Sequence, residues 1–144
     1  MTDGAGAYLA ASKAKGERQK DKVKGLMDKN DLSERLFRFA VDILKMLKTL
    51  NGGFEVNIIS FQLGKSATSS GANYDESQAA VSRADFSNKI AISLKEMRES
   101  NYWLRILKEL FPNNPEIERL NNESDELKKI LGSINKKINL KKQD

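Results

Sequence analysis

The side chains that could carry chemistry in this sequence are hydroxyls, carboxylates and cations, because its 144 residues include no cysteine and no histidine. Histidine is the commonest general base, and both missing residue types are frequent metal ligands. One group of neighbouring residues could serve a serine–lysine hydrolase, and it consists of Lys65, Ser66, Thr68, Ser69 and Ser70. The same small residues would also suit a contact between packed helices, and we favour that interpretation.

Two further chemical patterns are incomplete. Residues 64–66 (Gly-Lys-Ser) resemble the end of a phosphate-binding loop, but Ile59 stands where that loop needs its first glycine. Glu96 and Glu99 are close in sequence, yet a di-metal site in a helical bundle needs Glu-x-x-His motifs. The sequence therefore predicts no catalytic residue, no metal site and no cofactor.

Cations and two adjacent aromatic residues remain as candidates for binding. The formal net charge is +5, which mildly favours polyanionic partners. Six basic residues follow one another along a single predicted helix, where they either bind a polyanion or are ordinary solvated charges: Arg83, Lys89, Lys95, Arg98, Arg105 and Lys108. Tyr102 and Trp103 could stack on a nucleic-acid base, although packing in a core or a subunit interface is favoured.

The elements that position these residues are predicted to be helices. Asp31, followed by Glu34 at the spacing of a capping box, predicts a first helix that ends at residues 51–53 (Asn-Gly-Gly). A second helix opens at Phe54 and ends near Val81. Within it, residues 64–72 are nearly all small, so this stretch is either a loop or a helix with a smooth face that lets another backbone approach closely.

Two more helices complete the pattern. Ser82 with Asp85 predicts an N-cap and a third helix from Arg83. Asn114 predicts another cap, because Pro115 would then occupy the first helical position, where its missing N–H costs nothing. The fourth helix carries apolar residues at alternating spacings of three and four, with one serine among them: Ile117, Leu120, Ser124, Leu127, Leu131, Ile134 and Ile138.

Four helices with short connections predict an all-α, up-down-up-down four-helix bundle over residues 32–144, preceded by a flexible, basic N-terminal tail over residues 1–31. The tail is either an arm for polyanions or a solvated extension, and the second interpretation is favoured. No apolar run approaches the roughly 18–20 residues of a membrane span, and the first 20 residues lack the apolar core of a secretory signal. We therefore expect a cytoplasmic protein.

Two stretches carry a resemblance to a known family. Residues 62–78 (QLGKSATSSGANYDESQ) look like the pattern Q-L-x-R/K-S-x-T-S-x-G-A-N-x-x-E-A-Q, with Ser77 where the family usually has alanine. The second stretch matches at SRADF (82–86), Lys89, AISLKE (91–96), Glu99 and YWL (102–104). The chain thus resembles the four-helix bundle proteins encoded in intervening sequences of bacterial 23S ribosomal RNA genes.

The resemblance implies a continuous helix through residues 64–72 and a homo-oligomer, since members of the family form ring-like pentamers. It also implies a distant relation to the accessory protein of diversity-generating retroelements, a basic pentamer that binds nucleic acid and a reverse transcriptase. Together with the basic charge, it favours a non-enzymatic bundle that binds RNA or a ribonucleoprotein. The predicted phosphate contacts are Lys65, Arg83, Lys89, Arg98 and Arg105. The alternative is a scaffold that binds a partner protein and no nucleic acid.

Overall fold

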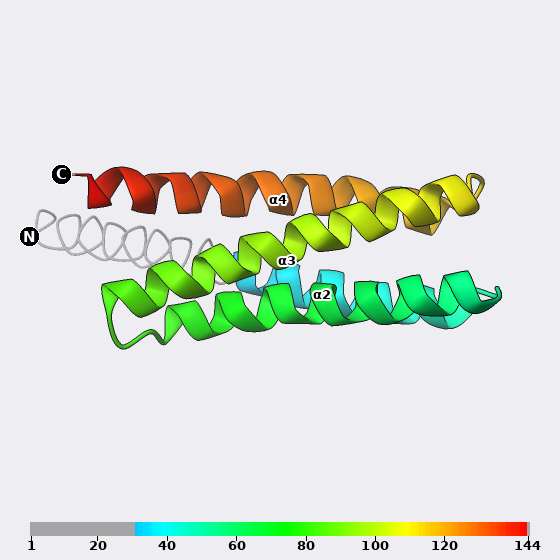
Figure 1. Cartoon of the computed structure of the whole chain (residues 1–144), viewed down its shortest axis with the longest axis horizontal. Coiled ribbons are helices and arrows are strands. Elements are labelled where there is room, and N and C mark those ends of the chain that lie inside the picture. The colour runs from blue at the N-terminus through cyan, green and yellow to red at the C-terminus, as the bar shows by residue number, and fades with distance from the viewer. Residues whose placement is uncertain (1–30, 144) are drawn as a thin grey trace, which may run out of the picture. The chain divides into compact units, whose positions relative to one another are not determined.

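Helices account for nearly all of the chain that the computed structural model describes, which is residues 31–143 (Figure 1). Residues 31–49 are helical, and they are followed by α2 (Phe54–Gln78), α3 (Arg83–Leu110) and α4 (Pro115–Lys142). The described residues contain these four helices and no strand, so the predicted all-α fold class is confirmed. The predicted tail lies outside the described residues, except for residue 31. The packing below concerns the unit Arg35–Asp144.

Local side chains begin α3 and α4, as predicted. The backbone N–H of Asp85 donates to Ser82 Oγ (3.0 Å), which satisfies one of the free donors at the start of α3. Asn114 Oδ1 accepts from the backbone N–H groups of Glu116 and Ile117, both at 3.1 Å, with Pro115 at the first helical position of α4. Both caps depend on neighbours in the sequence, which is why the sequence predicts them.

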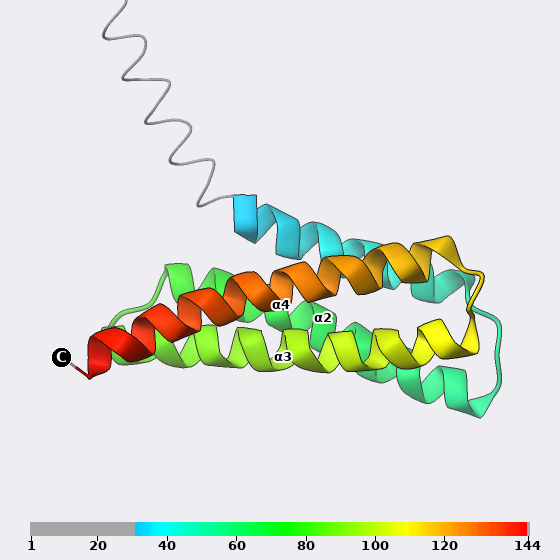
Figure 2. The same ribbon diagram turned by 90° about the horizontal axis from the view of Figure 1, so that it is seen from above.

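Neighbouring helices run antiparallel. Ser66 of α2 contacts Ser100 of α3, and Ser70, further along α2, contacts Ser93, which lies earlier in α3. Figures 1 and 2 show α3 running alongside both α2 and α4. The helical segment 35–49 completes the bundle. It packs against Gly64 and Gly71 of α2. Two ion pairs join it to α4: Arg35 with Glu123, and Asp42 with Arg119. The order is therefore up-down-up-down, as predicted.

The core is formed by one apolar face of each helix. Five apolar residues of α3 are buried at helical spacing: Ile90, Leu94, Met97, Leu104 and Leu107. The seam of α4 is buried from Ile117 to Leu131, while Ile134 and Ile138 are only partly covered. The buried residues of the first segment are Leu36, Phe39, Ile43 and Met46.

The small residues of α2 form a smooth helical face and not a loop. Gly71 lies against the backbone of Leu36, since an added Cβ would be 3.5 Å from the Leu36 carbonyl oxygen. Gly64 faces the side chains of Leu44 and Leu47, which an added Cβ would approach to 3.5 and 3.7 Å. The two glycines are seven positions apart, so both lie on the face of α2 that meets the first segment. This contact explains why a stretch of poor helix formers stays helical: tertiary packing outweighs local propensity.

One prediction at a helix end is wrong. The second helix ends at Gln78 and not near Val81, because the N–H groups of Ala79 and Ala80 bond three residues back and tighten the last turn. Residue 31 is helical, in agreement with the prediction that a helix starts at Asp31. Phe37 and Leu44 of the first segment are exposed by 56% and 44%.

Candidate nucleic-acid interface

Five exposed or half-exposed side chains from α3 and α4 surround a shallow groove between the two helices: Arg98, Tyr102, Arg105, Lys128 and Lys129. We call this set the α3–α4 basic cluster. Arg98, Tyr102 and Arg105 are spaced by four and three residues, so they form one stripe along α3. The antiparallel packing of α4 brings the two lysines to the same groove, with Asn101 beneath them.

A buried hydrogen-bond network fixes the floor of this groove. Asn101 Nδ2 donates to Ser124 Oγ (2.9 Å) and to Asp125 Oδ1 (3.0 Å), and Lys128 Nζ donates to Asn101 Oδ1 (3.3 Å). Lys128 also pairs with Asp125 at 3.4 Å. Because the amide of Asn101 uses both ends to join α3 to α4, it holds the two helices in one register. That register decides which cations face each other across the groove.

The ring of Tyr102 is supported from one side. Its centroid lies 5.2 Å from that of Trp103, with the ring planes at 71°, which is an edge-to-face contact. Trp103 is half-buried, and its Nε1 donates to Glu99 Oε1 (3.3 Å). Tyr102 itself remains 54% exposed. The sequence left base stacking and packing open for both residues. In the structure Trp103 packs against the bundle, whereas Tyr102 faces solvent.

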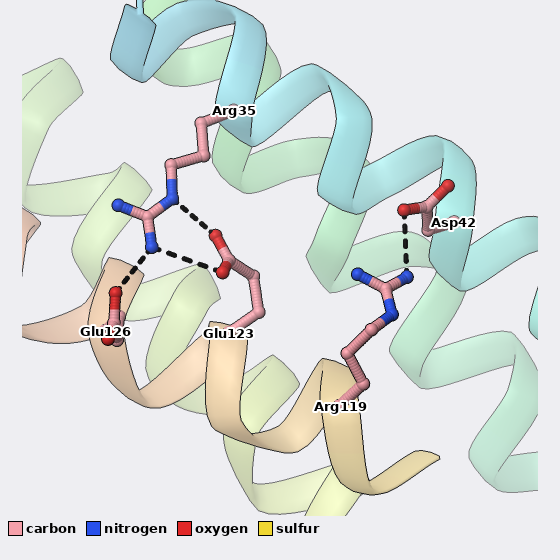
Figure 3. A network of polar contacts seen from close by, with 5 residues as sticks. All are labelled: Arg35, Asp42, Arg119, Glu123 and Glu126. Carbon is pink, nitrogen blue, oxygen red and sulfur yellow. Dashed lines mark hydrogen bonds and ion pairs between the residues drawn. The ribbon is translucent and has the colours of Figure 1, made fainter. Parts of the chain in front are cut away.

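Two arginines of the bundle, Arg35 and Arg119, are paired with carboxylates. Figure 3 shows Arg35 of the first segment donating to both oxygens of Glu123 on α4, at 2.6 and 3.1 Å, and to Glu126 at 2.6 Å. These acceptors raise the pKa of the Arg35 guanidinium above its ordinary value. Arg119 similarly bridges α4 and the first segment through Asp42, at 3.0 Å (Figure 3). Both arginines join helices, so their charge is balanced inside the bundle.

The cluster differs in this respect. Arg98, Arg105 and Lys129 form no ion pair with any residue in the described part of the chain, and all three are exposed. Of the cluster's cations, Lys128 has an acidic partner among the described residues, Asp125. The groove therefore carries excess positive charge.

The five predicted phosphate contacts do not form one site. Arg98 and Arg105 lie together in the α3–α4 basic cluster. Lys89 is at the α2 side of α3, where it pairs with Glu76 at 2.7 Å, and this hydrogen bond raises the pKa of the Lys89 ammonium. Lys65 is exposed on α2. Their role as phosphate contacts stays a prediction.

Arg83 lies at the opposite end of α3 from Arg105. It lines a second hollow with Phe86 of the same helix and three residues near the end of α4: Ile138, Lys141 and Lys142. Lys142 Nζ donates to Ser87 Oγ at 2.7 Å, which ties the end of α4 to the start of α3. The structure thus adds a smaller basic group around Arg83, separate from the main cluster.

Two of the hydroxyl residues considered for nucleophilic chemistry, Ser66 and Ser70, serve packing. Ser66 Oγ and Ser100 Oγ are 2.8 Å apart, and both are buried between α2 and α3. Ser70 Oγ donates to the Ser93 carbonyl and Ser93 Oγ donates to the Ser70 carbonyl, each at 2.8 Å. These paired bonds satisfy polar groups that small side chains bring close to a neighbouring backbone. The favoured interpretation of this stretch, a helix–helix contact, agrees with the geometry.

Residues 31–143 hold neither a carboxylate metal site nor a membrane span. No three histidine, cysteine, aspartate or glutamate side chains in this part of the chain are grouped so that they could hold a metal ion. None of the helices between residues 31 and 143 is long and apolar enough to cross a membrane.

Asn101, Lys128 and Lys129 belong to the groove, although the sequence patterns did not indicate them. The periodicity of α3 and α4 places each residue on a face of its own helix, but it does not say which residue of one helix lies opposite which residue of the other. The buried polar pair Asn101 and Ser124 was the available signal, because polar residues within an apolar seam must find partners. When Asn101 is aligned with Ser124, Lys128 and Lys129 of α4 lie in the same groove as Arg98.

The fold and the groove define an all-α four-helix bundle protein with a basic groove between its last two helices. The family model of the 23S rRNA-intervening sequence protein matches residues 28–133, so the chain belongs to that family. It is also similar to a solved structure of a protein of unknown function from the S23 ribosomal protein family of Bacteroides thetaiotaomicron VPI-5482. The two share 40% identity with a TM-score of 0.63, over 73% of this chain and 98% of the other. No curated protein matches this chain.

Proposed function

We propose that this protein is a non-enzymatic, cytoplasmic RNA-binding or ribonucleoprotein-binding bundle, and that the α3–α4 basic cluster is its binding site. The observation that carries the proposal is the contrast between two sets of cations. Arg35 and Arg119 are neutralised by carboxylates within the bundle, whereas Arg98, Arg105 and Lys129 are exposed without an ion pair to any described residue. Unpaired cations at one groove attract the phosphates of a nucleic acid, because each phosphate that a cation neutralises releases a counterion.

The test is the salt dependence of RNA binding. We expect fluorescence anisotropy with a labelled RNA to show an affinity that falls steadily as salt rises. A variant with both Arg98→Ala and Lys129→Ala should bind more weakly and with a shallower dependence, because each phosphate of a single strand that is no longer neutralised lowers the log–log slope by about 0.7. Lys48→Ala, an exposed lysine of the first segment, is the matched control. Affinity that does not change with salt would refute the proposal.

The second candidate is an assembly role, and an exposed apolar stripe favours it. Phe54, Ile58 and Phe61 follow one another at spacings of four and three on the outer side of α2, away from the buried Val56 and Leu63. Phe54 and Phe61 are 78% and 69% exposed. We call these three residues the α2 apolar stripe. Aligned exposed aromatics mark interaction surfaces more often than single exposed residues do.

We propose that a second copy of this chain covers the stripe, in line with the homo-oligomer that the family resemblance implies. Light scattering on a sizing column should then give a mass several times the 16.2 kDa of one chain. A monomer would reject this candidate. An oligomer free of nucleic acid that captures a defined partner protein after nuclease treatment would favour the scaffold interpretation over RNA binding.

A further inference from the structure

We infer that the α3–α4 basic cluster binds an unpaired strand of RNA, with one base stacked on the ring of Tyr102 and the adjoining phosphates on Arg98, Arg105 and Lys129. The inference rests on the proposed function, because it specifies which form of nucleic acid that site takes. The inference gives Tyr102 a role, whereas a site that bound phosphates through cations alone would not need an aromatic ring.

The position of Tyr102 is the first observation. Arg98 and Arg105 lie about one helical turn to either side of it on the same stripe of α3, which is about 5.4 Å along the axis in each direction. A base on the tyrosine ring would therefore have a guanidinium near the phosphate on each side. Lys129 reaches the same groove from α4 and adds a third cation. Alternation of an aromatic platform with cations is the arrangement that single-strand binding uses.

The second observation is that the ring of Tyr102 is restrained by a neighbouring side chain and is also exposed to solvent. Trp103 makes an edge-to-face contact with it, at 5.2 Å between centroids, and Trp103 Nε1 donates a hydrogen bond to Glu99. A ring restrained in this way loses little conformational freedom when a base stacks on it. Yet 54% of Tyr102 is exposed, so the ring is not needed to fill the core.

A duplex would use this groove differently. In a double helix the bases are stacked on one another, and a protein surface of cations reaches mainly phosphates and sugars. Tyr102 would then contribute little to affinity. An acidic polypeptide could also neutralise the cations, but it has no flat base to place on the ring. The exposed aromatic residue thus favours an unpaired strand over both alternatives.

The chain contains a single tryptophan, Trp103, and this gives a local probe of the site. The first experiment titrates the full-length protein with a short, unstructured RNA, with the same strand annealed to its complement, and with polyglutamate. Trp103 fluorescence and anisotropy of the labelled RNA are both recorded. We expect the single strand to bind more tightly than the duplex, to change the Trp103 emission and to resist displacement by polyglutamate.

The second experiment compares variants of Tyr102. Tyr102→Ala and Tyr102→Leu should weaken binding of the single strand by about five- to 150-fold, the range measured for loss of one stacked base. Tyr102→Phe keeps the ring and should bind like the unchanged protein. Phe37→Ala is the matched control, because Phe37 is exposed to a similar extent (56%) on the first segment. Circular dichroism checks that each variant is folded.

The outcomes separate the two proposals. Equal affinity for single strand and duplex, with no loss in Tyr102→Ala but weakening in the Arg98→Ala and Lys129→Ala variant, would overturn the stacking inference and leave RNA binding intact. Absence of salt-dependent binding to either form would overturn both. Displacement of the RNA by polyglutamate at equal charge would also overturn the inference and point to an acidic protein partner.

Discussion

At the scale of single residues, buried polar side chains show where the α3–α4 contact is complete and where it is not. Asn101 has partners at both ends of its amide. Asn121 lies one turn away from Ser124 on α4, and its side-chain oxygen is buried without a hydrogen-bond partner in the described structure. An unsatisfied buried acceptor costs about 1–3 kcal/mol because its bond to water is lost on folding.

We therefore expect Asn121→Leu to raise the free energy of unfolding by about 1 kcal/mol, since leucine fills a similar volume without the unpaired oxygen. Urea unfolding followed by circular dichroism measures this change. Asn101→Leu is the comparison and should lower stability, because it removes the hydrogen bonds that Asn101 makes with Ser124, Asp125 and Lys128. A loss of stability in Asn121→Leu would show that this amide makes a favourable interaction.

Glu96 makes stability depend on pH through its surroundings. Burial raises the pKa of the Glu96 carboxyl and the charge of Glu99 raises it further, while Lys95 and Lys65 oppose the shift. A carboxyl whose pKa is higher in the folded state than in the unfolded chain binds protons more readily when folded. Its charged form therefore costs stability at neutral pH, and that cost disappears as the pH falls through the folded pKa.

Glu96→Gln removes the charge and keeps the shape. We expect this variant to be more stable at about pH 7, by less than about 1 kcal/mol because the carboxyl is partly solvated. The difference should shrink in unfolding measurements at about pH 4, where glutamate in either state takes up its proton. Glu109→Gln, at an exposed position of the same helix, is the control. A stability difference that grows towards acid pH would contradict the assigned direction.

At the scale of elements, the approach of α2 to the first segment depends on the absence of side chains. Gly71 has the backbone of Leu36 beside it, so a long side chain there would push the two helices apart. Ala72 is the next residue on the same helix, but it is exposed. Both positions lie within the same helix, but Gly71 is packed against another helix and Ala72 faces solvent.

We expect Gly71→Leu to lower the free energy of unfolding by about 2 kcal/mol, because overpacking costs more than the gain in helix propensity. Ala72→Leu should change it by less than about 0.5 kcal/mol, as other exposed substitutions do. Thermal or urea unfolding distinguishes them. Equal effects at the two positions would mean that helix propensity, and not packing against Leu36, sets the choice of glycine.

At the scale of the whole molecule, charge and apolar surface occupy different helices. The unpaired cations of the α3–α4 basic cluster lie between the last two helices, whereas the α2 apolar stripe lies on the outer side of α2. An assembly through the stripe could leave the groove free for a ligand. Repeating the groove in several copies would then raise the effective affinity for a long strand.

The joint substitution of Phe54→Ser and Phe61→Ser tests the assembly. Both side chains are largely exposed in the single chain, so we expect the variant to stay helical while its mass by light scattering falls to that of one chain. The affinity for a long RNA should fall with the mass, and the affinity for a short RNA should change little. An unchanged mass would locate the contact between copies elsewhere.

Features that depend on neighbours along the chain follow from the amino-acid sequence alone. Ser82 and Asn114 cap helices through groups two or three residues away, and the alternation of three and four in α4 defines its buried face from Ile117 to Leu131. The lack of histidine and cysteine excludes whole classes of chemistry through composition. These features are local or compositional, so no partner helix is needed to predict them.

Features that depend on the register between helices require the tertiary structure. Local propensity leaves residues 64–72 balanced between loop and helix, and the packing of Gly71 on Leu36 selects the helix. The pairing of Asn101 with Ser124 brings Arg98 and Arg105 to the lysines of α4, while Lys89 turns to Glu76. Periodicity gives each residue a direction about its own helix axis, but the sliding of one helix along another is fixed by contacts between residues far apart in the chain.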